Sequence, residues 1–137
     1  MRMTMTRRKA VATAIGVVLA AAALIAYALL RGDPLSWSKP AELSSDGKRL
    51  SLVAIGGACA DRTTVDVDES ADRVVVTIRQ LSLASACSDV GVPVQIVAEL
   101  DEPLGDRDLV DGYCEAPEHA RDAGCRGTAP LVERTGS

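Results

Sequence analysis

The sequence predicts a small all-β domain, antiparallel and either sandwich-like or a half-open barrel, which is stapled by disulfides and preceded by one transmembrane helix. Three observations predict it: an uncharged apolar run near the N-terminus, a series of segments in which apolar and polar residues alternate, and an even number of cysteines. The chain has 137 residues, which is enough for one domain.

The apolar run covers residues 10–30, AVATAIGVVLAAAALIAYALL. As a helix it would be about 30 Å long, the thickness of the hydrocarbon core of a bilayer. The tail before it, residues 1–9, is richer in basic residues than the segment after it. The positive-inside rule therefore keeps this tail in the cytoplasm and places the C-terminal domain outside a cell membrane that the chain crosses once.

A cleaved signal peptide is the alternative to an anchor. Ala26-Tyr27-Ala28 fits a small-x-small cleavage site, and cleavage there would make the protein secreted. If the segment is retained, its small residues Ala12, Gly16 and Ala20 are spaced for close helix packing, which would permit self-association through the anchor. In both cases the residues from 31 onward lie outside the cytoplasm.

Residues 31–47 are rich in Ser, Pro and Gly, which predicts a linker. The extracytoplasmic β-domain is expected over residues 48–127, followed by a flexible tail over 128–137. Period-two alternation with many β-branched residues predicts four strands. They are expected over residues 48–56, 63–69, 73–80 and 92–100, with a hairpin connection at 69–72.

The four cysteines are Cys59, Cys87, Cys114 and Cys125. An even number of cysteines in an oxidising compartment indicates two disulfides, for which three pairings exist. Short loop closure favours Cys59–Cys87 and Cys114–Cys125, which would stabilise the fold by roughly 3.5 and 3 kcal/mol. The spacing matches neither a redox C-x-x-C motif nor a zinc site, and we expect no cofactor.

The strongest candidate for a functional site is the acidic stretch LDEPLGDRDLVDG at residues 100–112. A structural interpretation is a type I turn over residues 102–105, then a short strand over 107–110. The alternative is a calcium site formed by four aspartates, although their spacing is not that of an EF-hand. These residues are Asp101, Asp106, Asp108 and Asp111.

The same stretch carries a resemblance. The segment ACADRTTVDVDESADRVVVTIR, a cysteine in the following loop, and the words PLGDR (103–107) and VDG (110–112) resemble small actinobacterial cell-envelope proteins. The resemblance covers residues 50–112. It implies an N-terminal anchor or signal and a short β-rich outer domain, and it implies no activity and no catalytic residue.

The most direct functional prediction is a membrane-anchored, non-catalytic binding or scaffolding module of the cell envelope, which recognises an envelope protein or a surface ligand. A sensor or accessory subunit of a neighbouring membrane protein is a variant of this prediction. The alternative is an extracytoplasmic hydrolase or accessory enzyme that uses residues 101–111. After residue 30 there are nineteen acidic and eleven basic residues, a net charge of −8, with two aromatic residues. This composition argues against binding of nucleic acid.

Overall fold

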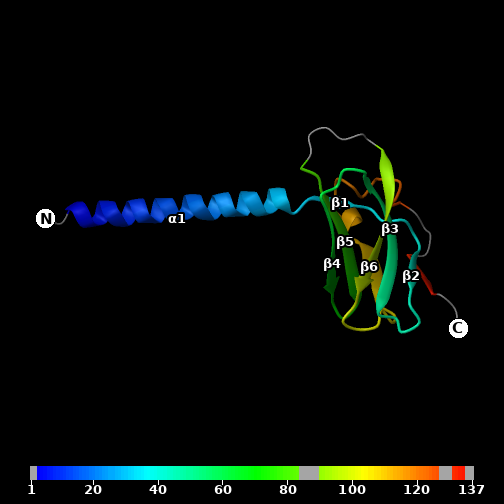
Figure 1. The fold of residues 1–137 in the computed structure, drawn as a ribbon. Coiled ribbons are helices and arrows are strands. Elements are labelled where there is room, and N and C mark those ends of the chain that lie inside the picture. The colour runs from blue at the N-terminus through cyan, green and yellow to red at the C-terminus, as the bar shows by residue number, and fades with distance from the viewer. Residues whose placement is uncertain (1–2, 84–89, 127–130, 135–137) are drawn as a thin grey trace. The chain divides into compact units, whose positions relative to one another are not determined.

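The computed structural model describes residues 3–83, 90–126 and 131–134. The chain divides into two compact units, Met1–Gly32 and Asp33–Ser137. The first unit contains one helix, and the second contains all the strands of the described residues (Figure 1). The protein is therefore mostly β outside its N-terminal helix, as the sequence predicts.

Helix α1, Met3–Leu30, contains the apolar run. Its part Thr13–Leu30 has a mean hydropathy of 2.4, and all of its side chains are exposed. Eighteen residues of helix span about 27 Å, and exposed apolar side chains over that length are stable in lipid but not in water. This helix has the length and composition of a membrane anchor or of a signal sequence.

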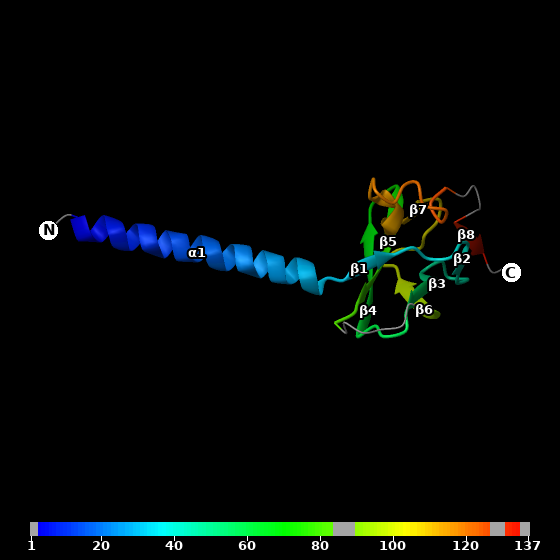
Figure 2. The same ribbon diagram turned by 90° about the horizontal axis from the view of Figure 1, so that it is seen from above.

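The strands form two four-stranded sheets that lie as separate layers (Figure 2). One sheet, here called sheet A, contains β1 (Asp33–Leu35), β4 (Arg62–Glu69), β5 (Arg73–Leu81) and β7 (Asp108–Asp111). The other, sheet B, contains β2 (Ala41–Leu43), β3 (Arg49–Gly57), β6 (Gly91–Glu99) and β8 (Val132–Arg134). The longest strands are the four that the alternation pattern predicts.

Strand β5 organises sheet A. Along one edge it pairs with β4 in antiparallel register through the predicted hairpin, which the bond from Ser70 N–H to the Arg73 carbonyl closes at 2.9 Å. Its other edge is shared by two short strands: β7 pairs in parallel with its first half, and β1 pairs antiparallel with its second half. The chain leaves sheet A after β1 and crosses to sheet B, where Trp37 forms an isolated bridge with Ala54 of β3.

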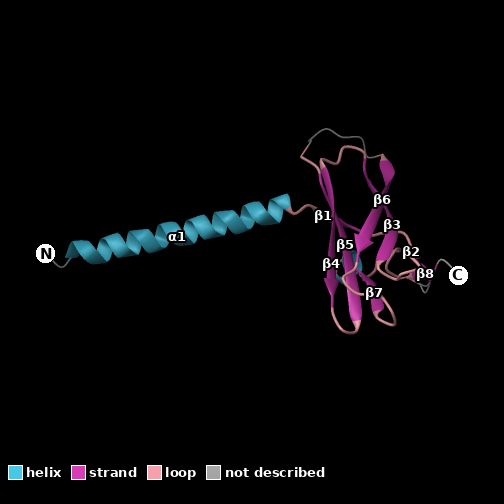
Figure 3. Ribbon diagram, turned by 60° about the horizontal axis from the view of Figure 1, so that its bottom comes forward, coloured by secondary structure: helices cyan, strands magenta, loops and turns pink. Residues whose placement is uncertain are grey.

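The two sheets enclose one hydrophobic core, which gives a sandwich-like arrangement (Figure 3). Alternate residues of β3 and β5 point into it because successive side chains of a strand face opposite sides. The largest side chains that are less than 2% exposed are Trp37, Leu50, Leu52, Val74, Val76, Ile78 and Leu104. Between the sheets, the buried Gln80 accepts a hydrogen bond from Gly57 N–H at 2.6 Å and donates one to Thr63 Oγ1 at 3.2 Å.

The linker predicted for residues 31–47 is wrong from Asp33 onward. This segment contains β1 and β2, and it supplies Trp37 and Ala41 to the core. Its Ser and Pro content reflects a short crossing between sheets and not a solvated tether. The flexible tail predicted for 128–137 is also partly wrong, because β8 pairs in parallel with β2.

Two local details differ from the antiparallel fold and type I turn that the sequence predicts. The pairs β5–β7 and β2–β8 are parallel, since β7 and β8 both arrive by long connections. The turn lies two residues later than expected: the Leu104 carbonyl accepts from Arg107 N–H at 3.1 Å, and Gly105 adopts a φ of +56°. Glycine takes that conformation without the steric cost of a Cβ atom.

Gly112, at the junction of β7 and the 3₁₀ helix η1 (Gly112–Glu115), tests the packing of this junction. A Cβ atom there would lie 1.9 Å from Thr77 Oγ1, so Gly112→Ala must push the chain away from β5. We expect a loss of about 1–3 kcal/mol in the free energy of unfolding, measured by denaturation followed through Trp37 fluorescence. In Gly57→Ala the nearest atom would be 3.6 Å away, so this control should unfold like the wild type. Equal stability of the two variants would contradict the packing described.

Candidate functional site

The carboxylate of Asp111 is the most buried acidic group of the acidic stretch. Its side chain is 2% exposed and accepts four hydrogen bonds from four different residues. Oδ2 accepts from Ser36 Oγ at 2.8 Å, from Trp37 N–H at 3.3 Å and from Lys39 Nζ at 2.5 Å. Oδ1 accepts from Tyr113 N–H at 3.1 Å and so caps the start of η1.

Residues 36–40, here called the crossing segment, lead from sheet A to sheet B. Asp111 thus joins this crossing segment to the end of β7. Lys39 is 11% exposed, and its Nζ lies 4.7 Å from the centroid of the Trp37 ring, where the cation meets the negative face of the indole. The indole Nε1–H donates to the Val76 carbonyl at 3.4 Å. The only tryptophan of the chain is therefore fixed by an ion pair on one side and by β5 on the other.

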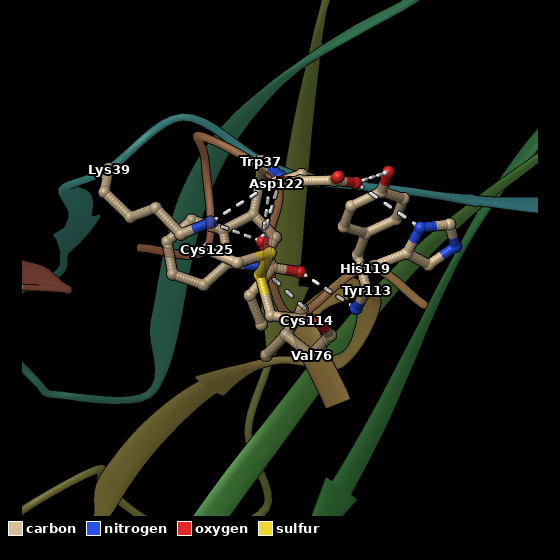
Figure 4. Close-up of a disulfide and its surroundings, with 10 residues drawn as sticks. Trp37, Lys39, Val76, Tyr113, Cys114, His119, Asp122 and Cys125 are labelled. Carbon is tan, nitrogen blue, oxygen red and sulfur yellow. Dashed lines mark hydrogen bonds and ion pairs between the residues drawn. A yellow bond between two sulfur atoms is a disulfide. The ribbon is translucent and has the colours of Figure 1, made fainter. Parts of the chain in front are cut away.

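The disulfide Cys114–Cys125 lies beside this cluster (Figure 4). It closes a segment of turns over residues 114–125, here called the disulfide arm. Trp37 and Lys39 lie on one side of the disulfide, and Tyr113 and His119 lie on the other. The Tyr113 and His119 rings are stacked, with centroids 4.0 Å apart. The predicted pairing of Cys114 with Cys125 is confirmed. Cys59 is disulfide-bonded as well, but its predicted partner Cys87 lies outside the described residues.

Asp122 interacts with both members of the stacked pair. Its Oδ2 accepts a hydrogen bond from the Tyr113 hydroxyl at 2.6 Å and lies 3.4 Å from His119 Nδ1. The bond to Asp122 stabilises the neutral phenol, and this raises the pKa of Tyr113 above its usual 10.0. The side chains of Tyr113, His119 and Asp122 thus contact one another beside the disulfide.

Arg107 organises the turn of the acidic stretch. Its guanidinium donates to the backbone carbonyls of Glu102 at 2.8 Å and Pro103 at 3.0 Å, and to the Glu69 carboxylate at 2.8 Å. The other oxygen of Glu69 accepts from Asp101 N–H at 2.6 Å. Arg107 and Glu69 are 12% and 16% exposed, so this pair ties the turn to the β4–β5 hairpin.

These hydrogen bonds set the charge state of Glu69. Its burial acts to raise the pKa, but the bonds from Asp101 N–H and Arg107 together outweigh burial. The pKa of Glu69 is therefore lowered from its usual 4.5.

The calcium site proposed from the sequence is not formed. Asp101, Asp106 and Asp108 are exposed, whereas Asp111 is buried against a lysine. Among the residues that the structure describes, no group of three His, Cys, Asp or Glu side chains is arranged to hold a metal ion. The buried Asp111 carboxylate is already paired with Lys39 and accepts from three further donors.

The serine hydroxyl and the histidine ring that a hydrolase could use each contact other partners among the described residues. Ser82 Oγ donates to the Cys59 carbonyl, while the polar partners of His119 and Tyr113 meet at Asp122. Ser85 and Ser88, which follow Ser82 in the loop between β5 and β6, lie outside the described residues. Within residues 101–111, the side chain of Arg107 holds the turn, and that of Asp111 caps η1 and holds Ser36, Trp37 and Lys39.

The outer face of sheet B carries a hollow that was not predicted from the sequence. It has a volume of about 480 Å³ and is lined by residues of β2, β3 and β6 together with Ser38 and Pro40. Glu42, Ser51 and Val97 occupy paired positions across the three strands, and Gln95 pairs with Val53. A second hollow of about 240 Å³ shares Glu42, Ser51 and Val97 and extends to Arg49.

This surface, here called the sheet B face, combines apolar and charged groups. Val97 is 54% exposed, and Glu42 and Arg49 are exposed beside it. The sequence signal for it lies in the alternating strands, because outward positions of β3 and β6 at the hollow carry Val53 and Val97 where a solvated face would carry polar residues.

Comparisons with protein families, with curated proteins and with solved structures give no match for this chain.

The pH dependence of stability tests the role of Glu69. Because its folded pKa lies below 4.5, its contribution to stability is complete above that pH and is lost as the pH falls through the folded value. Glu69→Gln should lower the free energy of unfolding by about 1–2 kcal/mol at pH 7 and should flatten the loss below pH 4.5. Denaturation between pH 3 and 7 measures this, with the exposed Asp68→Asn as control. An unchanged acid profile in Glu69→Gln would contradict the assignment.

Proposed function

We propose that this protein is a membrane-anchored recognition module of the cell envelope, which holds a sandwich-like β-domain outside the membrane and binds an envelope partner through the sheet B face. The observation that carries the proposal is the contrast between two regions. Asp111 and Arg107 of the acidic stretch are engaged in ion pairs inside the domain, whereas the sheet B face presents a hollow with exposed apolar and charged side chains.

The location rests on the N-terminal helix and on the disulfides. The span Thr13–Leu30 follows a basic tail, so its retention as an anchor leaves the domain on the outer side. The disulfide Cys114–Cys125 needs an oxidising compartment to persist. The resemblance of residues 50–112 to actinobacterial envelope proteins implies the same location.

Recognition without catalysis fits the chemistry of the sheet B face. Its central side chains are Val53, Gln95 and Val97, which offer contact area and hydrogen bonds but no acid–base pair. The polar rim, with Glu42 and Arg49, can select a partner by charge. An apolar centre with a charged rim is the usual anatomy of a binding surface.

Site-specific photo-crosslinking in the native envelope tests the proposal. A photoreactive residue at Val97, 54% exposed, should give one adduct of discrete mass. The same residue at Asp66, whose side chain is 55% exposed on sheet A, should give none. Gln95→Arg, which fills the hollow, should reduce the Val97 adduct by about fivefold or more without changing the fold. Equal adducts at the two positions, or an adduct that Gln95→Arg leaves unchanged, would refute the proposal.

A further inference from the structure

The β-domain has four exposed large apolar side chains among its described residues: Ile55, Leu83, Val90 and Val97. Val97 belongs to the sheet B face. The other three are 56%, 68% and 60% exposed and lie at one end of the domain, here called the apolar end, which neither the core nor the sheet B face explains.

The strand register brings the backbone near these three residues to one end of the domain. Gly57, the last residue of β3, pairs with Gly91, the first residue of β6, and donates to Gln80 near the end of β5. The side chain of Ile55 lies against Gly91, because a Cβ atom on that glycine would be 2.6 Å from Ile55 Cγ2. Val90 directly precedes Gly91.

Leu83 is held at the same end. It follows β5 by two residues, and its backbone N–H donates to Asp61 Oδ2 at 2.6 Å. The end of β5, the end of β3 and the start of β6 therefore meet, and each contributes one of the three apolar side chains.

The chain enters the β-domain from the same end. Asp33 pairs antiparallel with Gln80, so the residues before Asp33 continue in the direction taken by the residues after Gln80. The apolar span ends at Leu30. Three residues of chain extend at most about 11 Å, so Asp33 lies within that distance of the end of the apolar span.

Charge does not oppose contact of the apolar end with lipid. Among the described residues where the chain enters, Arg31 and Arg62 balance Asp33 and Asp61. The chain after residue 30 is otherwise acidic, with nineteen acidic and eleven basic residues. The apolar end is thus a neutral part of an acidic domain, which anionic headgroups repel least.

We infer that Ile55, Leu83 and Val90 form a lipid-contacting surface that seats the β-domain on the outer leaflet of the membrane that anchors it. Apolar side chains enter the boundary between headgroups and acyl chains when their backbone is held beside it. The inference rests on the anchoring part of the proposed function and not on the partner of the sheet B face. Val97 lies six residues beyond Gly91, about 20 Å along β6 from the apolar end.

Tryptophan fluorescence of the full-length chain in lipid vesicles tests the inference. Leu83→Trp, Val90→Trp and the control Val97→Trp are reconstituted in phosphatidylcholine with or without bromine near the headgroup end of the acyl chains. The wild-type chain supplies the background of the buried Trp37. We expect quenching at positions 83 and 90 to be about twofold or more that at position 97.

The outcomes separate this inference from the proposed function. Equal quenching at the three positions in a chain that floats with the vesicles would overturn the lipid contact alone, because the assay contains no envelope partner. A chain that does not float with the vesicles would overturn both the lipid contact and the anchor on which the proposed function depends.

Discussion

One buried carboxylate, that of Asp111, holds the β-domain together at the point where its parts converge. It accepts hydrogen bonds from Ser36, Trp37 and Lys39 of the crossing segment and from the backbone of Tyr113 at the start of the disulfide arm. A charge with 2% exposure is costly unless it is fully paired, so these groups depend on one another. The position of the core tryptophan, the docking of the arm and the closure of the two sheets all follow from this pairing.

The use of charge inside the domain decides where function can lie. Asp111 and the pair of Arg107 with Glu69 take the most conspicuous acidic and basic side chains out of solution. What remains for recognition is the sheet B face, where ordinary residues such as Val53 and Gln95 form the hollow. The aspartates were the predicted site because unusual composition is visible in the sequence. A surface that three strands form together is visible only when their register is known.

The long strands were predictable because each carries its own signal. Alternation in β3, β4, β5 and β6 depends on local burial of one face, and the connection at 69–72 is local too. The short strands β1, β2 and β8 were missed because three residues hold no period and their pairing partners are distant. Trp37 and Asp111 are 74 positions apart, so nothing near either residue indicates that they meet.

The stability of Asp111→Asn, compared with that of Asp108→Asn on the same strand, tests the structural role of this carboxylate most directly. Chemical denaturation of the full-length chain in detergent, followed through Trp37 fluorescence, measures both. The account predicts a loss of about 3 kcal/mol or more for Asp111→Asn, since Lys39 loses its buried partner, and almost none for the exposed Asp108→Asn. Equal stability of the two variants would contradict the account and would reopen Asp111 as a residue kept for a ligand.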